Sequence, residues 1–283
     1  MISSDKWKDY ELIDCSDGRR LERWGKYILS RPDPQVIWKN QKKSSLWNKA
    51  DAVYDREGGG GSWIKKDVPE FWTINYSNFT LKVKPMGFKH TGVFPEQAAN
   101  WDFIQKKIRE SGREAKVLNL FAYTGAASIA AAAAGASVCH VDAAKGMVAQ
   151  AKENAVLSSL ENAPIRYIVD DCNKFIEREI RRGNKYDGII MDPPSYGRGP
   201  SGEVWKLEDN IGRFIESAAK LLSDDPLFFI VNSYTTGLSP SSIGYLMNLT
   251  LKGGKIECDE LGLRVTQTGA CLPCGGTARW TKY

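Results

Sequence analysis

Apolar runs and amphipathic stretches alternate along the chain from about residue 95 onward. Residues 96–110 place four apolar side chains on one face at helical spacing, which predicts an amphipathic helix. These side chains are Ala98, Trp101, Ile104 and Ile108. Apolar runs that predict buried strands follow at 117–122, 136–142, 165–170, 186–192 and 226–233. Helical patterns follow these strands at 126–135, 144–159, 172–183, 205–222 and 239–254.

Five repeats of strand and helix favour a mostly parallel sheet with helices on both faces, because parallel strands need long crossover connections. Two further strand patterns, at 255–265 and 275–280, close the series. The predicted fold class is therefore α/β, with a doubly wound, mostly parallel sheet of seven strands. Sheets of this kind bind ligands beyond the carboxyl ends of their strands, near the point where the strand order reverses.

The first third of the chain has a different pattern, in which short β-like runs are separated by turn residues. Breaks fall at Asp17-Gly18 and at Pro32-Asp33-Pro34, and residues 71–86 alternate with a period close to two, as in a hairpin. We therefore predict two domains: a small β-rich domain over residues 1–84 and an α/β domain over residues 85–283.

The net charge of +5 is concentrated in that first third, and so are six of the nine tryptophans. Residues 1–90 contain 17 Lys and Arg against 12 Asp and Glu, whereas the rest of the chain contains 22 of each. Basic residues interleaved with aromatic rings can contact phosphates and stack on bases. The alternative is that the tryptophans form the core of the small domain. We expect packing to account for most of the tryptophans and the excess charge to favour a nucleic acid.

The overall composition is that of a globular chain, with 42% hydrophobic and 26% charged residues. No apolar run reaches the roughly 18 residues of a membrane span, and the charged N-terminus does not have the pattern of a signal peptide. Six cysteines are scattered along the chain, which is typical of reduced thiols. We therefore expect a cytoplasmic protein.

Candidate ligand-binding residues follow the first predicted strand, in the turn Phe121, Ala122, Tyr123, Thr124 and Gly125. Gly125 allows a tight turn and a close approach to a ligand, and the following helix start offers free N–H groups to a carboxylate. The dinucleotide pattern G-x-G-x-x-G is missing, which counts against a nicotinamide enzyme.

Acidic residues stand at the ends of the next three predicted strands. Asp142 ends the second strand, where a carboxylate can accept hydrogen bonds from ribose hydroxyls. Asp170, Asp171 and Cys172 end the third, where an acid can accept a hydrogen bond from an adenine amino group, and Asp192 ends the fourth. A ligand that matches these strand ends has an amino-acid carboxylate, a ribose and an adenine. That ligand is S-adenosyl-L-methionine.

The fourth strand runs directly into Asp192, Pro193, Pro194, Ser195 and Tyr196. Two prolines stop a strand and give a stiff, extended corner. We expect the carbonyl groups of this corner to be free to accept hydrogen bonds from a flat polar group, and Tyr196 to stack on it. The alternative is an ordinary end of a strand.

The order FAYTG, VD, DD and DPPS resembles the class I S-adenosylmethionine-dependent methyltransferases, whose sheet is Rossmann-like. The segments GFKHTGVFPEQAANW, NLFAYTGAAS and VDAAKGMVAQAKENA are similar to those of the bacterial large-subunit ribosomal RNA methyltransferase group. The likeness covers about residues 85–280. It departs at Val93-Phe94-Pro95-Glu96, where an aspartate usually precedes the glutamine.

The resemblance implies a role for each matching residue. Phe121, Tyr123, Thr124 and Gly125, with Ala122 between them, would surround the methionine part of the methyl donor. Asp142 and Ala143 would hold the ribose and adenine, and Asp171 and Cys172 would meet the adenine edge. Phe94 and Gln97 would complete the cofactor pocket, with Gln97 closing it from outside. Asp192, Pro193, Pro194, Ser195 and Tyr196 would face the methyl group and its acceptor, which the family makes an RNA base.

Two chemistries are open for methyl transfer. In amino methylation, Asp192 and Pro193 would accept hydrogen bonds from an exocyclic amino group. In carbon methylation, a thiolate must first add to a pyrimidine ring, and the candidates are Cys274 and Cys271. Neither cysteine has a basic neighbour in sequence to lower its pKa, so we favour the cysteine-independent route. No second C-x-x-C motif or nearby histidine pair completes a zinc site, so no metal is expected.

Two further interpretations compete with a methyltransferase. A non-catalytic RNA- or ribosome-binding module with the same fold has no physical need for the intact DPPS corner and Asp142. A Rossmann dehydrogenase is disfavoured by the missing glycines. Binding measured against S-adenosylmethionine and NADH separates these interpretations.

Overall fold

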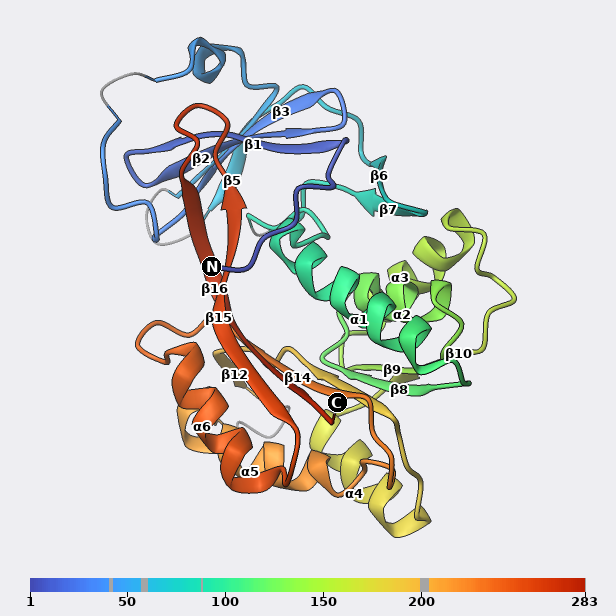
Figure 1. Cartoon of the computed structure of the whole chain (residues 1–283). Helices are drawn as coiled ribbons and strands as arrows, with labels where there is room; N and C mark the ends of the chain where they lie inside the picture. The colour runs from blue at the N-terminus through green and yellow to red at the C-terminus, as the bar shows by residue number, and fades with distance from the viewer. Residues whose placement is uncertain (41–42, 57–60, 88, 199–203, 283) are drawn as a thin grey trace. The chain divides into compact units, whose positions relative to one another are not determined.

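The structure is a computed structural model that describes residues 1–40, 43–56, 61–87, 89–198 and 204–282 (Figure 1). Its internal contacts divide the chain into two compact units. The first comprises Met1–Ala99 and Leu261–Cys274, and the second comprises Asn100–Glu260 and Gly275–Tyr283. The predicted domain boundary between residues 84 and 85 stays a prediction. None of the described helices is long and apolar enough to cross a membrane.

A seven-stranded sheet forms the centre of the second unit and confirms the predicted fold class. Its strands, in spatial order, are β10 (Ile165–Val169), β9 (Ser137–Asp142), β8 (Lys116–Leu120), β11 (Gly188–Met191), β14 (Phe228–Ser233), β16 (Cys271–Thr281) and β15 (Lys255–Arg264). The first five are parallel to their neighbours, whereas β16 runs antiparallel to β14. The chain proceeds outward from β8 in both directions, so the strand order reverses between β8 and β11.

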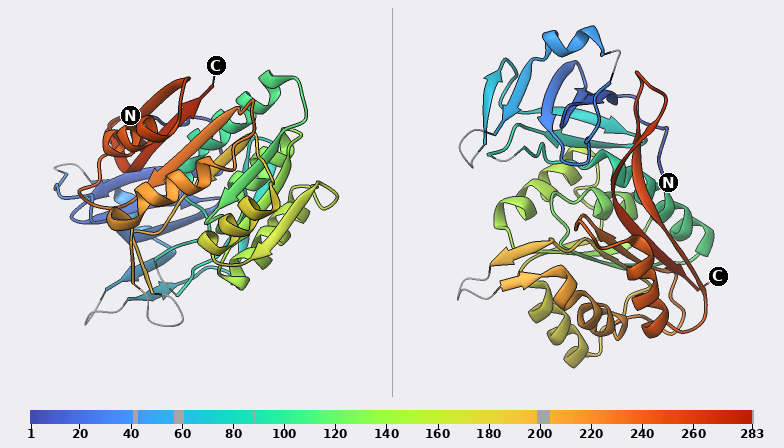
Figure 2. Two further views of the ribbon diagram at one scale, coloured as in Figure 1. Left: turned by 90° about the horizontal axis from the view of Figure 1, so that it is seen from below. Right: turned by 90° about the vertical axis from the view of Figure 1, so that its left-hand side faces the viewer.

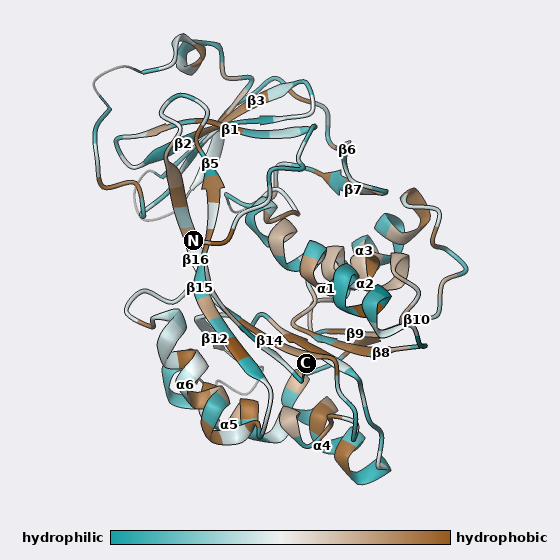
Figure 3. Ribbon diagram, viewed as in Figure 1, coloured by the Kyte–Doolittle hydropathy of each residue, from teal (hydrophilic) through white to brown (hydrophobic). Residues whose placement is uncertain are grey.

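Helices cover both faces of this sheet, as Figures 1 and 2 show. They are α1 (Ala98–Ser111), α2 (Ala126–Ala133), α3 (Lys145–Leu157), α4 (Cys172–Arg182), α5 (Leu207–Ala219) and α6 (Pro240–Thr250). Apolar residues of α4, α5 and α6 share one buried cluster with Leu118 and Leu120 of β8. Apolar residues of α1 and α2 share another with Val117. Alternate residues of one strand thus face opposite layers, and Figure 3 shows the hydrophobic colour along β8, β9 and β14.

The first unit is rich in β-structure, as predicted. A five-stranded sheet contains β1 (Tyr10–Ser16), β2 (Arg19–Trp24), β3 (Tyr27–Pro32), β4 (Ala52–Asp55) and β5 (Ser62–Lys66). The predicted hairpin is β6 (Trp72–Tyr76) with β7 (Phe79–Val83), and two short 3₁₀ helices span Ser45–Lys49 and Pro95–Gln97. Residues 261–274, which include the turn between β15 and β16, also belong to this unit. The N–H groups of Thr266 and Gln267 donate to carbonyls of β1.

Of the six tryptophans of the first unit, one is fully buried, four are partly buried and Trp38 is 36% exposed, so a core position is confirmed for Trp24 alone among the six. Trp24 is buried, and five others donate their indole N–H groups to acceptors within the unit. These five are Trp7, Trp38, Trp47, Trp63 and Trp72. Part of the basic charge is likewise used internally, as in the ion pairs of Arg19 with Asp55 and Arg23 with Glu11.

A buried ion cluster around Glu22 joins strands β1, β2 and β3. The Glu22 carboxylate accepts two hydrogen bonds from Arg31, at 2.7 and 2.8 Å, and one from the Tyr10 hydroxyl at 2.9 Å. Arg20 lies 3.7 Å from the same carboxylate. Burial opposes ionisation of Glu22, but these cations and hydrogen bonds together hold its pKa below the ordinary value.

Glu22→Gln is expected to lower the free energy of unfolding by about 3–5 kcal/mol, because it leaves the buried Arg31 guanidinium without its counter-charge, whereas Arg20 keeps its ion pair with Asp33. Glu11→Gln is the matched control, since the pair of Glu11 with Arg23 is one-third exposed on each side and contributes at most about 1 kcal/mol. Urea unfolding measures both variants. Because the pKa of Glu22 is lowered by folding, the difference between wild type and Glu22→Gln should shrink as the pH falls through that lowered pKa. Equal losses in the two variants would contradict this account.

Candidate active site

The carboxyl ends of β8, β9, β10 and β11 lie in register along one edge of the sheet. Leu120 pairs with Val141 of β9 and with Met191 of β11, and Asp142 pairs with Val169 of β10. The segments that follow these strands therefore start side by side. The structure thus brings together the four strand ends on which the sequence placed the candidate ligand residues.

The turn after β8 has an unusual backbone. Phe121 and Tyr123 have φ angles of 56° and 50°, in the left-handed region that side chains other than glycine seldom adopt. Each is held by a hydrogen bond to its N–H group: Cys172 Sγ accepts from Phe121 at 3.4 Å, and Asp142 Oδ2 accepts from Tyr123 at 2.8 Å. The Ala122 N–H donates to the Val141 carbonyl at 3.0 Å. Neighbouring strand ends thus fix the shape of the turn.

Gly125 ends this turn with a φ of 85°, as the predicted tight turn requires. A Cβ atom at this position would lie 2.8 Å from the Ala151 side chain of α3, so the close approach seen at Gly125 is to a helix. Asn154, also on α3, donates its side-chain amide to the Thr124 carbonyl at 2.9 Å. Sequence reasoning missed Asn154, although a polar residue among the apolar positions of this helix was a signal.

Asp142 uses both carboxylate oxygens within the site. Oδ2 accepts from the Tyr123 N–H and Oδ1 from the Ala144 N–H, both at 2.8 Å. Burial raises the pKa of Asp142 above its ordinary value, against the effect of these two N–H groups. Each carboxylate oxygen can accept a second hydrogen bond. Ala143, the next residue, is exposed.

The polar groups at the end of β10 are partly used within the protein. Asp170 forms an ion pair with Arg178, and Asp171 caps α4 by accepting from the Lys174 N–H at 3.0 Å through Oδ1. Cys172 is buried, and burial raises its pKa to about 12. Its side chain therefore supports the Phe121 turn, and at this helix start only its main-chain N–H is left for a ligand.

The Asp192–Tyr196 corner differs from the expectation of free carbonyls. The Pro194 carbonyl accepts from the indole N–H of Trp205 at 2.7 Å, and the Ser195 carbonyl accepts from the Leu207 N–H at 3.1 Å. Two of the carbonyls are thus taken by the chain itself, because a short hairpin folds back on the corner. Within the part of the chain that the structure describes, no donor reaches the Pro193 carbonyl.

The hairpin that follows the corner has two different faces. It pairs β12 (Tyr196–Arg198) with β13 (Val204–Lys206), with Tyr196 opposite Lys206 and Gly197 opposite Trp205. Side chains alternate between the faces of a strand, so Tyr196 and Lys206 share one face and Trp205 lies on the other. The Tyr196 side chain is 52% exposed, whereas Trp205 packs against the buried cluster of α4, α5 and α6.

The other candidate residues lie in the first unit. Cys274 is buried, and burial raises its pKa well above the ordinary value, which disfavours the thiolate that a nucleophile requires. Burial also raises the pKa of Cys271. Phe94 precedes the 3₁₀ helix Pro95–Gln97, in which Gln97 is buried. These residues belong to the first unit, and their roles in the site stay predictions.

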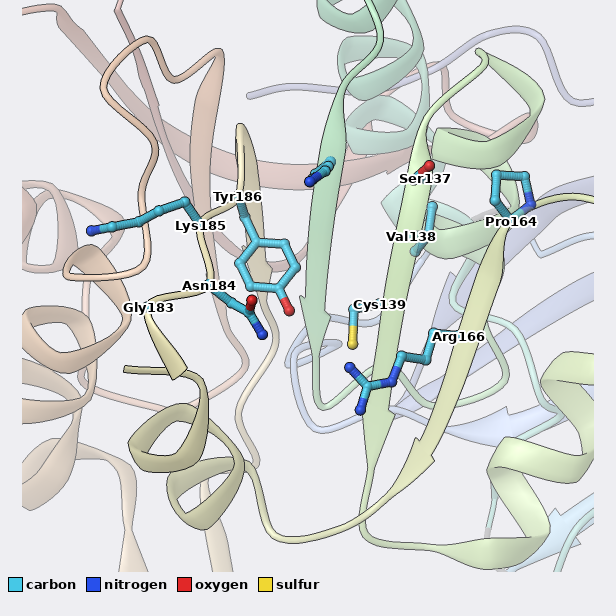
Figure 4. A pocket seen from close by; sticks show the side chains of 10 residues that line it. Ser137, Val138, Cys139, Pro164, Arg166, Gly183, Asn184, Lys185 and Tyr186 are labelled. Atoms are coloured by element: carbon cyan, nitrogen blue, oxygen red, sulfur yellow. The ribbon is translucent and has the colours of Figure 1, made fainter. Parts of the chain in front are cut away.

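A cavity of about 480 Å³ lies at the opposite edge of the sheet (Figure 4). Lys116 and Ser137, which line it, are the first residues of β8 and β9, so the cavity faces the amino ends of the strands. Arg166 and Cys139 point into the same space. Parallel sheets of this type bind their ligands at the carboxyl ends. The cavity is therefore separate from the candidate active site.

Comparison with known proteins identifies the family. A family model described as S-adenosylmethionine-dependent methyltransferase matches residues 50–232. A crystal structure of an S-adenosylmethionine-dependent methyltransferase from Agrobacterium tumefaciens is 39% identical, with a TM-score of 0.93, and the match covers 100% of this chain and 93% of that one. This chain belongs to the S-adenosylmethionine-dependent methyltransferase family.

Other relatives extend the comparison. The ribosomal RNA large subunit methyltransferase K/L of Chromohalobacter salexigens is 30% identical over 181 residues, which is 62% of this methyltransferase and 24% of that protein. The chain thus spans about a quarter of the length of such relatives. A methyltransferase structure from Streptococcus mutans has a TM-score of 0.74 at 20% identity, covers 98% of this chain and 76% of that one, and shows the shared fold alone.

Asn154→Ala is expected to weaken S-adenosylmethionine binding by about five- to tenfold, because the Thr124 carbonyl loses its donor and the turn loosens; a lost hydrogen bond of this kind costs about 1 kcal/mol. Calorimetry gives the affinity. Asn40→Ala is the control, since Asn40 also donates its amide to a main-chain carbonyl but lies in the first unit. An unchanged affinity in Asn154→Ala would show that the turn does not need this contact.

Proposed function

We propose that this methyltransferase transfers the methyl group of S-adenosylmethionine to a base in RNA. The acceptor atom is the nitrogen of an exocyclic amino group, and the substrate is large-subunit ribosomal RNA. The observation that carries the proposal is the corner after β11. Among the residues that the structure describes, no donor reaches the Pro193 carbonyl, and Pro193 directly follows Asp192, whose carboxylate can accept several hydrogen bonds. Two acceptors side by side match the two hydrogens of an amino group.

The methyl-donor site that we propose lies along the neighbouring strand ends. The second lone pairs of the two Asp142 oxygens fit a ribose diol, and the free oxygen of Asp171 with the Cys172 N–H fits an adenine edge. Helix α2 begins at Ala126, and its first N–H groups have no intrahelical partner, which suits the amino-acid carboxylate. The turn after β8 lies between the adenosine and the amino-acid parts of the methyl donor; it consists of Phe121, Ala122, Tyr123, Thr124 and Gly125. Phe94 and Gln97 remain the proposed outer closure.

Bound S-adenosylmethionine supplies an electrophilic methyl group on a sulfonium. The acceptor nitrogen attacks that methyl carbon in line, so the N–C bond forms as the S–C bond breaks and S-adenosylhomocysteine leaves as a neutral thioether. The residues of the chain position that nitrogen. Asp192 and the Pro193 carbonyl accept its N–H groups, and the Asp192 carboxylate is the base nearest to the proton that leaves as the N–C bond forms. Tyr196 offers an exposed ring to stack on the base, beside the cation of Lys206.

The choice of RNA rests on three supports. Curated relatives are named for ribosomal RNA of the large subunit. The hairpin places an exposed aromatic ring and a lysine directly after the corner. The first third of the chain carries the net positive charge. A ribosomal substrate and six free cysteines both agree with a cytoplasmic location.

The first test concerns Asp142. Asp142→Ala is expected to weaken S-adenosylmethionine binding by about 1.5–3 kcal/mol, because hydrogen bonds to a carboxylate are charge-assisted. Asp225→Ala is the matched control: it removes another carboxylate of the second unit, one that pairs with Arg113 and precedes β14, and should leave the affinity nearly unchanged. Circular dichroism checks that both variants fold. Calorimetry that finds equal affinities in the two variants would remove Asp142 from the site.

The second test concerns the acceptor and uses tritiated methyl transfer to RNA from a strain lacking the gene, followed by nucleoside analysis. An N-methylated base is the expected product. Tyr196→Ala should slow transfer by roughly ten- to a hundredfold, the value of one stacked base, with the cofactor affinity unchanged. Tyr196→Phe keeps the ring and should stay close to wild type.

The cysteines provide the contrast in the same assay. Cys274→Ser and Cys271→Ser should transfer methyl groups at nearly the wild-type rate, because no thiolate takes part. A 5-methylpyrimidine product, or a covalent adduct trapped with 5-fluoropyrimidine RNA, would overturn the amino-group assignment. Binding of RNA and S-adenosylmethionine without any transfer would favour a non-catalytic module.

A further inference from the structure

Trp205 contacts both halves of the proposed site. It lies on β13 opposite Gly197, and its side chain is on the hairpin face that packs inward. Its ring lies 6.2 Å from that of Phe121 and 5.9 Å from that of Phe214, between ring centres. Phe121 and Phe214 are themselves 5.3 Å apart. The three rings therefore form one aromatic cluster.

Each member of this aromatic cluster belongs to a different part of the site. Phe121 is the first residue of the cofactor turn and has a left-handed backbone. Phe214 is fully packed on α5 and anchors the cluster in the core. Trp205 stands on the hairpin that follows the acceptor corner. A change in the position of the Phe121 ring thus reaches the hairpin through direct contact.

The polar edge of Trp205 acts on the acceptor corner itself. Its indole N–H donates to the Pro194 carbonyl at 2.7 Å. This bond occupies the Pro194 carbonyl. The Pro193 carbonyl can then accept a hydrogen bond from the amino group of the base that is methylated. A proline corner has few other ways to be held, because neither proline has an N–H group to donate.

We propose that Trp205 is a positioning residue that couples the cofactor turn to the acceptor corner. The indole ring packs against Phe121 and moves with it, and the indole N–H holds the Pro194 carbonyl in place. The inference rests on the proposed function insofar as the corner receives the acceptor base. The contacts that link the turn to the corner can nevertheless be measured in the absence of an RNA substrate.

The test separates the two parts of the indole. Trp205→Phe keeps an aromatic ring but removes the N–H group, so kcat/KM for RNA should fall about tenfold while the S-adenosylmethionine affinity stays within twofold. Trp205→Leu removes both parts and should also weaken the cofactor affinity, by about fivefold. Trp280→Phe is the matched control, because Trp280 donates its indole N–H to the Gly253 carbonyl at 2.6 Å elsewhere in the second unit. It should leave kcat/KM and the cofactor affinity unchanged, whatever it costs in thermal stability.

A spectroscopic measurement gives the same answer without activity. In protein labelled with 5-fluorotryptophan, the ¹⁹F resonances of Trp205 and Trp280 are assigned by their disappearance in the two phenylalanine variants. S-adenosylhomocysteine should shift the Trp205 resonance and leave that of Trp280 in place. A Trp205 resonance that does not respond, or a Trp205→Phe enzyme with wild-type kcat/KM, would overturn the coupling. If RNA is not methylated by the wild type but the resonance shifts, the proposed function fails and the coupling stands.

Discussion

The candidate site depends on the turn after β8, whose backbone adopts an energetically unfavourable conformation. Phe121 and Tyr123 hold left-handed conformations, each of which costs about 1–3 kcal/mol for a residue with a side chain. Hydrogen bonds from neighbouring elements offset this cost. They involve the thiol of Cys172, the carboxylate of Asp142 and the side-chain amide of Asn154, which bonds to the Thr124 carbonyl. The turn therefore keeps this shape only when three neighbouring elements are in place: β9, α3 and the start of α4.

This dependence explains which parts of the molecule were predictable from sequence. The strands and helices of the second unit follow from periodicity, since each element repeats its pattern over many residues. Strand-end residues such as Asp142 were predictable as well, because parallel strands in one sheet bring their carboxyl ends to a common edge. Asn154 and Trp205 were not, because their partners Thr124 and Pro194 are 30 and 11 residues away and neither contact repeats along the chain.

The proline corner shows a different limit of sequence reasoning. Prolines predict that a strand stops and that N–H donors are missing, and both statements concern only the local chain. Whether a carbonyl is free depends on what folds back against it. Here the hairpin returns through Trp205 and Leu207 and takes the carbonyls of Pro194 and Ser195. The corner thus offers fewer free carbonyls than its sequence indicates.

The organisation of the chain also limits how the two units can be separated. Residues 261–274 contain the ends of β15 and β16 and the turn between them, and they belong to the first unit, where Val265 pairs with Leu12 of β1. Leu261, Val265 and Leu272 are buried. A chain that lacked the first 84 residues would expose these apolar side chains and the N–H groups of Thr266 and Gln267, which donate to β1. A chain cut at the predicted boundary between residues 84 and 85 would therefore lose these contacts, and the boundary stays a prediction. A role toward RNA is best tested by changing exposed charges of this unit, such as Lys66 on β5, because such a change leaves these buried contacts in place.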